Sequence, residues 1–342
     1  MSDGPVLVSV FGKTDLGQTR EHNEDTFLVA DLSTGNASLH PEVRRHAVGA
    51  RGSLFLVADG MGGAAAGELA SAMAADLIYR HLATVWARDA DASASRFAYR
   101  MREAVERANQ QIYTYAREHP EVRGMGTTVT AAGVFGRDLY LAQIGDSRAY
   151  LVRGGEAIQI TKDQSLMQRL VDAGELTEAE AEQSERRNII LQALGPDPRI
   201  KVDLTHQSLR RGDTLIICSD GLSGLVRREE LGELSAEHGD LAALCTALID
   251  MANERGGPDN ITVVAARFEG DGLLQTSEPE EIGYQIYHLP EGEPAPTTVP
   301  ELVVEPAPLH EPLPSVAGRV GGGIYLVAAL LAVLVFLLAR WL

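Results

Sequence analysis

The sequence predicts an α+β domain in which helices cover antiparallel sheets. Short runs rich in apolar and β-branched residues outnumber the segments with helical spacing. Residues 136–138 and the glycine pair at 154–155 have the composition of hairpin turns, which implies antiparallel pairing of the strands around them. Long segments with helical spacing lie between the strands, and this combination favours helices layered on antiparallel sheets.

Nine strands and three helices are expected in the first 270 residues. The strands are short apolar runs at 6–11, 26–29, 54–58, 128–135, 138–144, 149–153, 157–160, 214–218 and 261–268. The helices are segments whose apolar side chains recur with a helical period, at 67–82, 96–117 and 241–255.

The chain divides by composition into three parts. Residues 1–270 have the mixed composition of one globular domain. Residues 271–318 become rich in Pro and Glu and poor in apolar side chains, so we expect an extended, disordered linker there. Residues 319–342 form a separate apolar tail.

The apolar tail predicts a single transmembrane anchor. Residues 320–339 carry no charge and are rich in Leu, Val and Ala, and a helix of this length spans roughly 30 Å, the thickness of a bilayer core. Arg319 stands before this segment, and Arg340 and Trp341 follow it, as is typical of membrane interfaces. The alternative is a buried core helix, but the Pro-rich segment before it offers no core. No signal peptide is expected, so we place the globular domain on the cytoplasmic side of the cell membrane.

Charge and cysteine content exclude several function classes. The formal net charge of −18 disfavours nucleic acid as a partner, because no basic field covers the chain. The two cysteines, Cys218 and Cys245, are not part of a CxxC pair, which argues against a disulfide framework or a zinc site.

Motifs that carry carboxylates recur beside the predicted strands. Asp59 and Asp220 each follow an apolar run and precede a glycine, so each is expected at a strand end with its carboxylate over the sheet edge. Taken singly, an Asp-Gly pair is usually a turn. Carboxylates delivered by several separate segments instead predict a pocket for hard divalent cations; the further motifs lie at 23–25, 145–148 and 259–260.

The ordered set of motifs resembles that of the metal-dependent protein phosphatases of type 2C, in particular their bacterial serine/threonine phosphatase branch. The similarity runs from about residue 8 to 268 and rests on the motifs at 14–25, 57–63, 67–68, 126–128, 145–150, 218–222 and 259–262. The resemblance implies a four-layer αββα sandwich, with two antiparallel sheets flanked by helices.

The resemblance also assigns metal ligands. Asp59 matches the carboxylate that bridges two metal ions, and Gly60 matches a ligand that acts through its carbonyl oxygen. Asp220 and Asp259 match the other ligands of the first metal. Glu24 matches a ligand of the second metal, usually through water, and Asp25 matches its supporting neighbour; Asp146 matches the residue that, with Asp220, holds a third metal.

Two further residues receive roles from the resemblance. Arg20 matches the arginine that grips the substrate phosphate, and its alternative role is an ion pair with Glu21 or Glu24. Asn260 is interpreted as a support for the ligands.

Met61 stands where many eukaryotic relatives have a histidine that protonates the leaving group, so we assign that proton to a metal-bound water. Residues 164 to about 200 match the variable flap that borders the active site, in which Arg186 and Arg187 are read as a solvated charge pair.

The chemistry of this donor set agrees with those roles. Oxygen ligands without nearby His or Cys favour Mn²⁺ or Mg²⁺ over Zn²⁺. Two such ions can lower the pKa of a shared water, which then attacks phosphorus. The sequence therefore predicts a metal-dependent protein serine/threonine phosphatase that acts on phosphorylated proteins at the membrane and opposes a Ser/Thr kinase, a partner implied by the family.

Three alternatives remain open at this point. One is a phosphoprotein-binding module without turnover, which the intact set of Asp59, Asp220 and Asp259 disfavours. Another is a stress-signalling phosphatase that acts on a phosphorylated anti-sigma antagonist. The third is a metal-dependent hydrolase of small phosphoesters.

Overall fold

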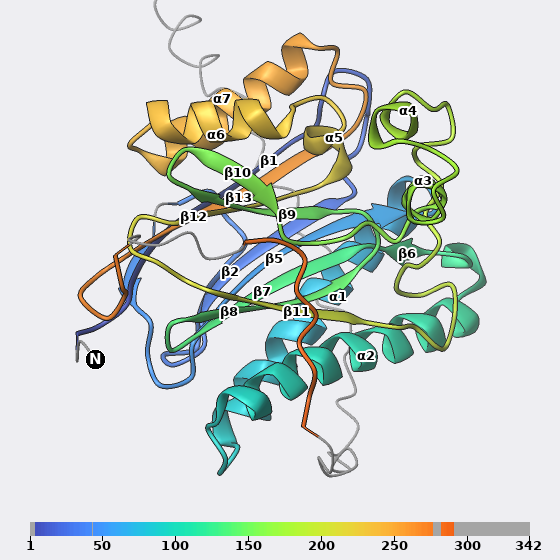
Figure 1. Ribbon diagram of the computed structural model, residues 1–342. Helices are drawn as coiled ribbons and strands as arrows, with labels where there is room; N and C mark the ends of the chain where they lie inside the picture. The colour runs from blue at the N-terminus through green and yellow to red at the C-terminus, as the bar shows by residue number, and fades with distance from the viewer. Residues whose placement is uncertain (1–3, 43, 276–281, 291–342) are drawn as a thin grey trace, which may run out of the picture. The chain divides into compact units, whose positions relative to one another are not determined.

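The computed structural model describes residues 4–42, 44–275 and 282–290. They form two antiparallel sheets that pack face to face, with helices on the outer face of each (Figure 1). The two-sheet architecture with flanking helices confirms the predicted α+β fold.

The first sheet has six strands in the order β10-β9-β12-β13-β1-β4. Their bounds are β1 Leu7–Asp15, β4 Arg44–Ala47, β9 Arg148–Arg153, β10 Glu156–Gln159, β12 Thr214–Cys218 and β13 Ile261–Glu269. The second sheet follows the order β11-β8-β7-β5-β2-β3, with β6 paired to β5 outside this path. Its strands are β2 Asp25–Asp31, β3 Asn36–Ser38, β5 Ser53–Met61, β6 Gly126–Thr127, β7 Val129–Phe135, β8 Asp138–Ile144 and β11 Asp203–Ser208.

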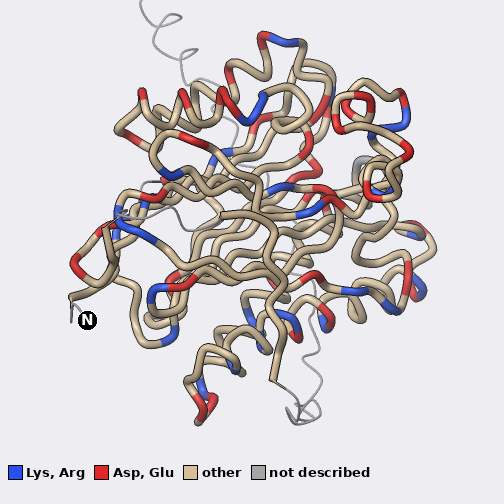
Figure 2. Tube along the Cα trace, in the orientation of Figure 1, with Lys and Arg blue, Asp and Glu red and all other residues tan. Residues whose placement is uncertain are grey.

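Two pairs of helices form the outer layers. Helices α1 (Ala64–Thr84) and α2 (Ala94–Glu118) cover the second sheet, and α6 (Arg228–Glu237) and α7 (Leu241–Glu254) cover the first. Shorter helices are α3 (Leu166–Asp172), α4 (Glu178–Glu182), α5 (Asp220–Ser223) and the 3₁₀ turns η1 (Trp86–Arg88) and η2 (Pro120–Val122). Figure 2 shows that Lys, Arg, Asp and Glu gather on the outer helices, the loops and the strand ends.

Apolar side chains fill the space between the layers. Val10, Phe27, Val57 and Phe268 belong to the core between the two sheets, and all are buried. A second cluster, which includes Leu244, packs α7 against the first sheet. Burial of apolar area on both faces of each sheet is the main force that holds the layers together.

All nine predicted strands and three predicted helices are present, mostly with longer bounds. Four strands were not predicted: β3, β4, β6 and β11. Three of these lie at the ends of the sheet orders, where a strand has a single neighbouring strand in its sheet and polar side chains are tolerated. Helices α3 to α6 were also missed, because they are short and mostly polar. The predicted strand at 128–135 is interrupted at Thr128, whose backbone and side chain bind Asp59 instead.

Part of the expected linker contacts the domain. Residues 282–290 run beside β11, where His206 N donates to Gln285 O at 3.1 Å and Tyr287 N donates to Leu204 O at 2.8 Å. The boundaries of the three sequence regions stay predictions. Among the described residues, no helix is long and apolar enough to cross a membrane, and the predicted span at 320–339 lies outside them.

Candidate metal centre and active site

Strand ends bring the predicted acids together at one end of the two sheets. Asp25 opens β2 and lies opposite Asp59 in the antiparallel register of β2 with β5. Asp146 follows β8 in the same sheet. Asp220 follows β12 and Asp259 precedes β13, so the other sheet delivers two more carboxylates. Residues from distant parts of the chain thus form one acidic cluster, defined here as Asp25, Asp59, Asp146, Asp220 and Asp259.

Burial and mutual repulsion perturb four of these acids. Burial raises the pKa of Asp25 to about 7, and the charges of Asp220 and Asp259 add to the effect. Burial, followed by the charge of Asp220, likewise raises the pKa of Asp146 to about 7. The pKa of Asp59 lies well above its ordinary value for the same reasons, and that of Asp220 is also raised. Charges that raise one another's pKa values lie close together in a medium of low dielectric constant.

The cluster has acceptor capacity that the protein does not use. Asp146 Oδ1 and Asp220 Oδ1 are buried and have no hydrogen-bond partner among the described residues. The charge of Asp220 also raises the pKa of Asp59, so two acidic groups compete for the same buried space. Buried oxygens without donors are costly, and a cation between them satisfies both the charge and the unused lone pairs.

The donors therefore fit a hard divalent cation by their chemistry. They are carboxylate oxygens together with the carbonyl of Gly60, and such ligands suit Mg²⁺ and Mn²⁺. Within residues 4–42, 44–275 and 282–290, no group of three or more Asp, Glu, His or Cys side chains is arranged so that it could hold a metal ion without a shift of side chains. The fit consequently rests on the donor types, the unpartnered oxygens and the raised pKa values.

Close backbone packing explains the glycine after Asp59. A Cβ atom at Gly60 would lie 2.2 Å from Gly67 O and 2.5 Å from Glu24 O, so a larger residue has no room. A Cβ atom at Gly67 would lie 2.0 Å from Glu24 Oε2. These two glycines let α1 and the loop before β2 approach Asp59 closely, and they place the partly buried Glu24 beside the cluster. Burial raises the pKa of Glu24.

Arg20 lies at the edge of the cluster. Its Nη2 pairs with Asp259 Oδ2 at 2.9 Å, with 48% of the Arg20 side chain and 29% of the Asp259 side chain exposed. The hydrogen bond with Asp259 raises the pKa of Arg20. The ion pair is therefore with a predicted metal ligand and not with Glu21 or Glu24, the alternative partners suggested by the sequence.

Asn260 braces the loop that carries Glu24. Its Oδ1 accepts a hydrogen bond from Glu24 N at 2.9 Å, and its Nδ2 donates to Leu16 O and His22 O, both at 3.0 Å. This amide ties the segment before β13 to the segment before β2. Its position agrees with the supporting role expected from the sequence.

Comparison with known proteins identifies the family. Residues 43–262 match the family model described as protein phosphatase 2C. The serine/threonine phosphatase Stp of Listeria welshimeri is 35% identical over 253 residues, which cover 74% of this chain and 92% of that protein. The chain belongs to the protein phosphatase 2C family.

Other members share both sequence and fold with this phosphatase. PstP of Mycobacterium tuberculosis is 38% identical over 254 residues, covering 74% of this chain but 44% of PstP. The crystal structure of the M. tuberculosis phosphatase PstP/Ppp has a TM-score of 0.64 at 35% identity and covers 77% of this chain and 99% of that one. The PstP catalytic domain in complex with two manganese ions has a TM-score of 0.62 at 33% identity, with the same coverage. The family and enzyme class predicted from the motifs are thereby confirmed.

Hydroxyl side chains support the acidic cluster in this phosphatase through contacts that were not predicted from the sequence. Thr128 Oγ1 accepts a hydrogen bond from Asp59 N at 3.1 Å and shares a second one with Ser147 Oγ at 2.7 Å. Ser219 Oγ donates to Asp25 Oδ2 at 2.8 Å, so this strand-end hydroxyl joins the two sheets. Threonine and serine within the motifs were the available signal, but only the fold shows which acidic residue each one contacts.

The flap of the phosphatase lies between residue 164 and about residue 200 and contains α3 and α4. It returns to the domain where Leu166 N donates to Ile189 O and Leu191 N donates to Gln164 O, at 2.9 and 2.8 Å. Arg186 and Arg187 are both exposed, and the charge of Arg187 only partly offsets the burial that raises the pKa of Asp220.

Proposed function

We propose that this protein is a serine/threonine phosphatase that hydrolyses phosphoserine and phosphothreonine in proteins with Mn²⁺ or Mg²⁺ as cofactor. The observation that carries the proposal is the acidic cluster, in which both sheets contribute carboxylates with raised pKa values and two unpartnered buried oxygens. Relatives named serine/threonine phosphatase, and a neighbour that binds two manganese ions, support the assignment.

The ligand roles follow the positions of the acids. Asp59 would be shared by two ions, with the carbonyl of Gly60, Asp220 and Asp259 on the first. Glu24 and Asp25 would serve the second ion, and Asp146 with Asp220 a third. When bound, such ions supply a water molecule that loses its proton near neutral pH.

The residues around the cluster position the substrate. Arg20 can donate two parallel hydrogen bonds to phosphoryl oxygens, which fixes the orientation of the phosphorus atom. Its present partner Asp259 is a proposed ligand, so neutralisation of Asp259 by a cation leaves the guanidinium available to the phosphate. Met61 has no proton to donate, so we assign protonation of the leaving serine or threonine oxygen to water.

The phosphatase is proposed to work at the cytoplasmic face of the cell membrane, tethered by residues 319–342, and to oppose a Ser/Thr kinase there. The support is the uncharged segment at 320–339 with Arg319 before it and Arg340 and Trp341 behind it. A shared membrane surface would raise the local concentration of phosphorylated membrane proteins around the enzyme.

Hydrolysis of a phosphothreonine peptide by the full-length protein tests the activity. We expect release of phosphate with Mn²⁺ or Mg²⁺, none after treatment with EDTA, and none from Asp220→Ala. Asp250→Ala is the matched control, because Asp250 is exposed on α7 and does not belong to the acidic cluster. Full activity of Asp220→Ala, or activity that is independent of metal, would refute the proposed chemistry.

A further inference from the structure

Residues 283–288, named here the strap, act as an additional strand on the edge of the second sheet. Besides its two backbone hydrogen bonds to β11, the strap forms an antiparallel bridge between Ile286 and Thr205, and Gln207 Nε2 donates to Gly283 O. The ring of Tyr287 packs at right angles on Tyr140, with 5.2 Å between centroids. The strap covers backbone groups of β11 that would otherwise form an open edge.

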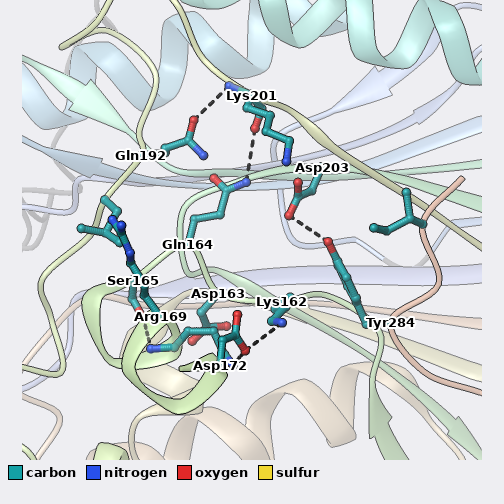
Figure 3. Close-up of a pocket in the computed structure, with 13 residues that line it drawn as sticks. Lys162, Asp163, Gln164, Ser165, Arg169, Asp172, Gln192, Lys201, Asp203 and Tyr284 are labelled. Carbon is teal, nitrogen blue, oxygen red and sulfur yellow. Dashed lines mark hydrogen bonds and ion pairs between the residues drawn. The ribbon is translucent and has the colours of Figure 1, made fainter. Parts of the chain in front are cut away.

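Tyr284 connects the strap to the flap. Burial raises the pKa of Tyr284 to about 12, so its hydroxyl stays protonated and donates to Asp203 Oδ2 at 3.1 Å. The Lys162 ammonium lies 5.7 Å from the centroid of the Tyr284 ring, and the same ammonium pairs with Asp172 at 2.8 Å, at the end of α3 (Figure 3). These groups and Leu191 line a cleft of about 490 Å³.

The residues after Lys162 continue this connection to the acidic cluster. Asp163 binds Arg148 through both carboxylate oxygens, at 2.8 to 3.0 Å. Gln164 N donates to Gly145 O at 2.8 Å, and Gly145 N donates to Gln164 Oε1 at 3.0 Å. Gly145 directly precedes Asp146. The segment 162–164 therefore holds the strap and α3 at one end and the loop that carries Asp146 at the other.

We propose that Tyr284 is a positioning residue for the flap: through Lys162 it fixes α3 beside the acidic cluster and so orients protein substrates. This inference rests on the proposed function. Lys162 has two partners, an aromatic face and a carboxylate, and both are needed to hold a flexible lysine in one place. Without the ring, the ammonium hydrates and α3 is held less firmly. A peptide substrate that extends over the flap senses this change, whereas a small ester that occupies only the acidic cluster does not.

Steady-state kinetics of the full-length protein with Mn²⁺ tests the inference. Tyr284→Leu is expected to raise the KM for a phosphothreonine peptide by about two- to five-fold, the range of one exposed cation–π contact, without a change in the KM for p-nitrophenyl phosphate. Tyr284→Phe keeps a ring over Lys162 and should retain the original KM. Lys162→Met should reproduce the effect of Tyr284→Leu, and the double variant should add nothing further.

Tyr287→Leu is the matched control, since Tyr287 belongs to the same strap but packs on Tyr140 and His206. It should lower the melting temperature and leave the peptide KM unchanged. An unaltered peptide KM in Tyr284→Leu, additive effects in the double variant, or an equal rise in Tyr287→Leu would overturn the inference. A wild-type protein that fails to hydrolyse either substrate would instead remove the proposed function and this inference with it. Tyr284→Phe and Lys162→Met keep the test informative if Tyr284→Leu does not fold.

Discussion

Asp146→Asn should make the metal-free protein more stable at alkaline pH, although it removes a proposed metal ligand. Asp146 is 6% exposed, and its Oδ1 has no hydrogen-bond partner among the described residues. Burial and the neighbouring Asp220 raise its pKa. A raised carboxyl pKa means that the folded state binds the proton more tightly than the unfolded chain does. The loss of folding stability that ionised Asp146 causes is therefore absent below pH 3.8, and it grows as the pH rises to about 7.

The size of the effect follows from those two pKa values. An increase from 3.8 to about 7 corresponds to about 4 kcal/mol of lost stability above pH 7, since each pH unit contributes ~1.36 kcal/mol. At pH 5 the same relation gives about 2 kcal/mol. The asparagine amide remains buried without a full set of partners, at a cost of about 2 kcal/mol. The net gain is thus about 2 kcal/mol at pH 8 and roughly zero at pH 5.

Thermal unfolding of the full-length protein in EDTA at pH 5 and pH 8 measures this difference. A gain of about 2 kcal/mol should raise the melting temperature by about 4–8 °C at pH 8. Asp213→Asn is the control. Asp213 is fully buried but pairs with Arg153 at 2.8 Å, so loss of the Asp213 charge should destabilise the protein. A less stable Asp146→Asn at pH 8, or an equal gain at both pH values, would refute the reasoning.

Three further outcomes are expected. Arg20→Ala should raise the KM for phosphopeptides about ten-fold with little change in kcat, because one charge-assisted contact of about 1.5 kcal/mol is lost; an unchanged KM in steady-state kinetics would withdraw its role in phosphate binding. Glu103→Gln should cost about 3 kcal/mol at pH 7. Burial opposes ionisation of Glu103, but hydrogen bonds from His81 and Arg100 lower its pKa from 4.5 to about 2. This stabilisation is present above pH 4.5 and is lost as the pH falls towards 2, so urea titrations of the two proteins should converge in acid. Deletion of residues 319–342 should move active enzyme from the membrane fraction to the soluble fraction; retention with the membranes would contradict the proposed tether.

The central elements could be predicted from the sequence because their patterns are local. Strands such as β8 and β12 are buried on both faces and read as continuous apolar runs, and α7 repeats its apolar side chains with the helical period. The edge strands β3, β4 and β11 lack such a signal, since their sequences are short or polar. In addition, β4 pairs with β1 and β11 pairs with β8, and both partners lie far away in the chain. The strap shows the same limit: a segment with the composition of a linker takes its place from the open edge of β11.

The sequence by itself determined the family, the oxygen-rich donor set and the candidate ligands, because the motifs with Asp59, Asp220 and Asp259 keep a fixed order and each sits beside a strand. Only the tertiary structure decided which of these acids repel one another and that Arg20 pairs with Asp259. It also decided that Thr128 binds the backbone of Asp59, that Ser219 binds the carboxylate of Asp25, and that Tyr284 contacts Lys162. Contacts between the two sheets join residues that are far apart in the chain, by 194 positions for Ser219 and Asp25, and no local pattern of side chains specifies them.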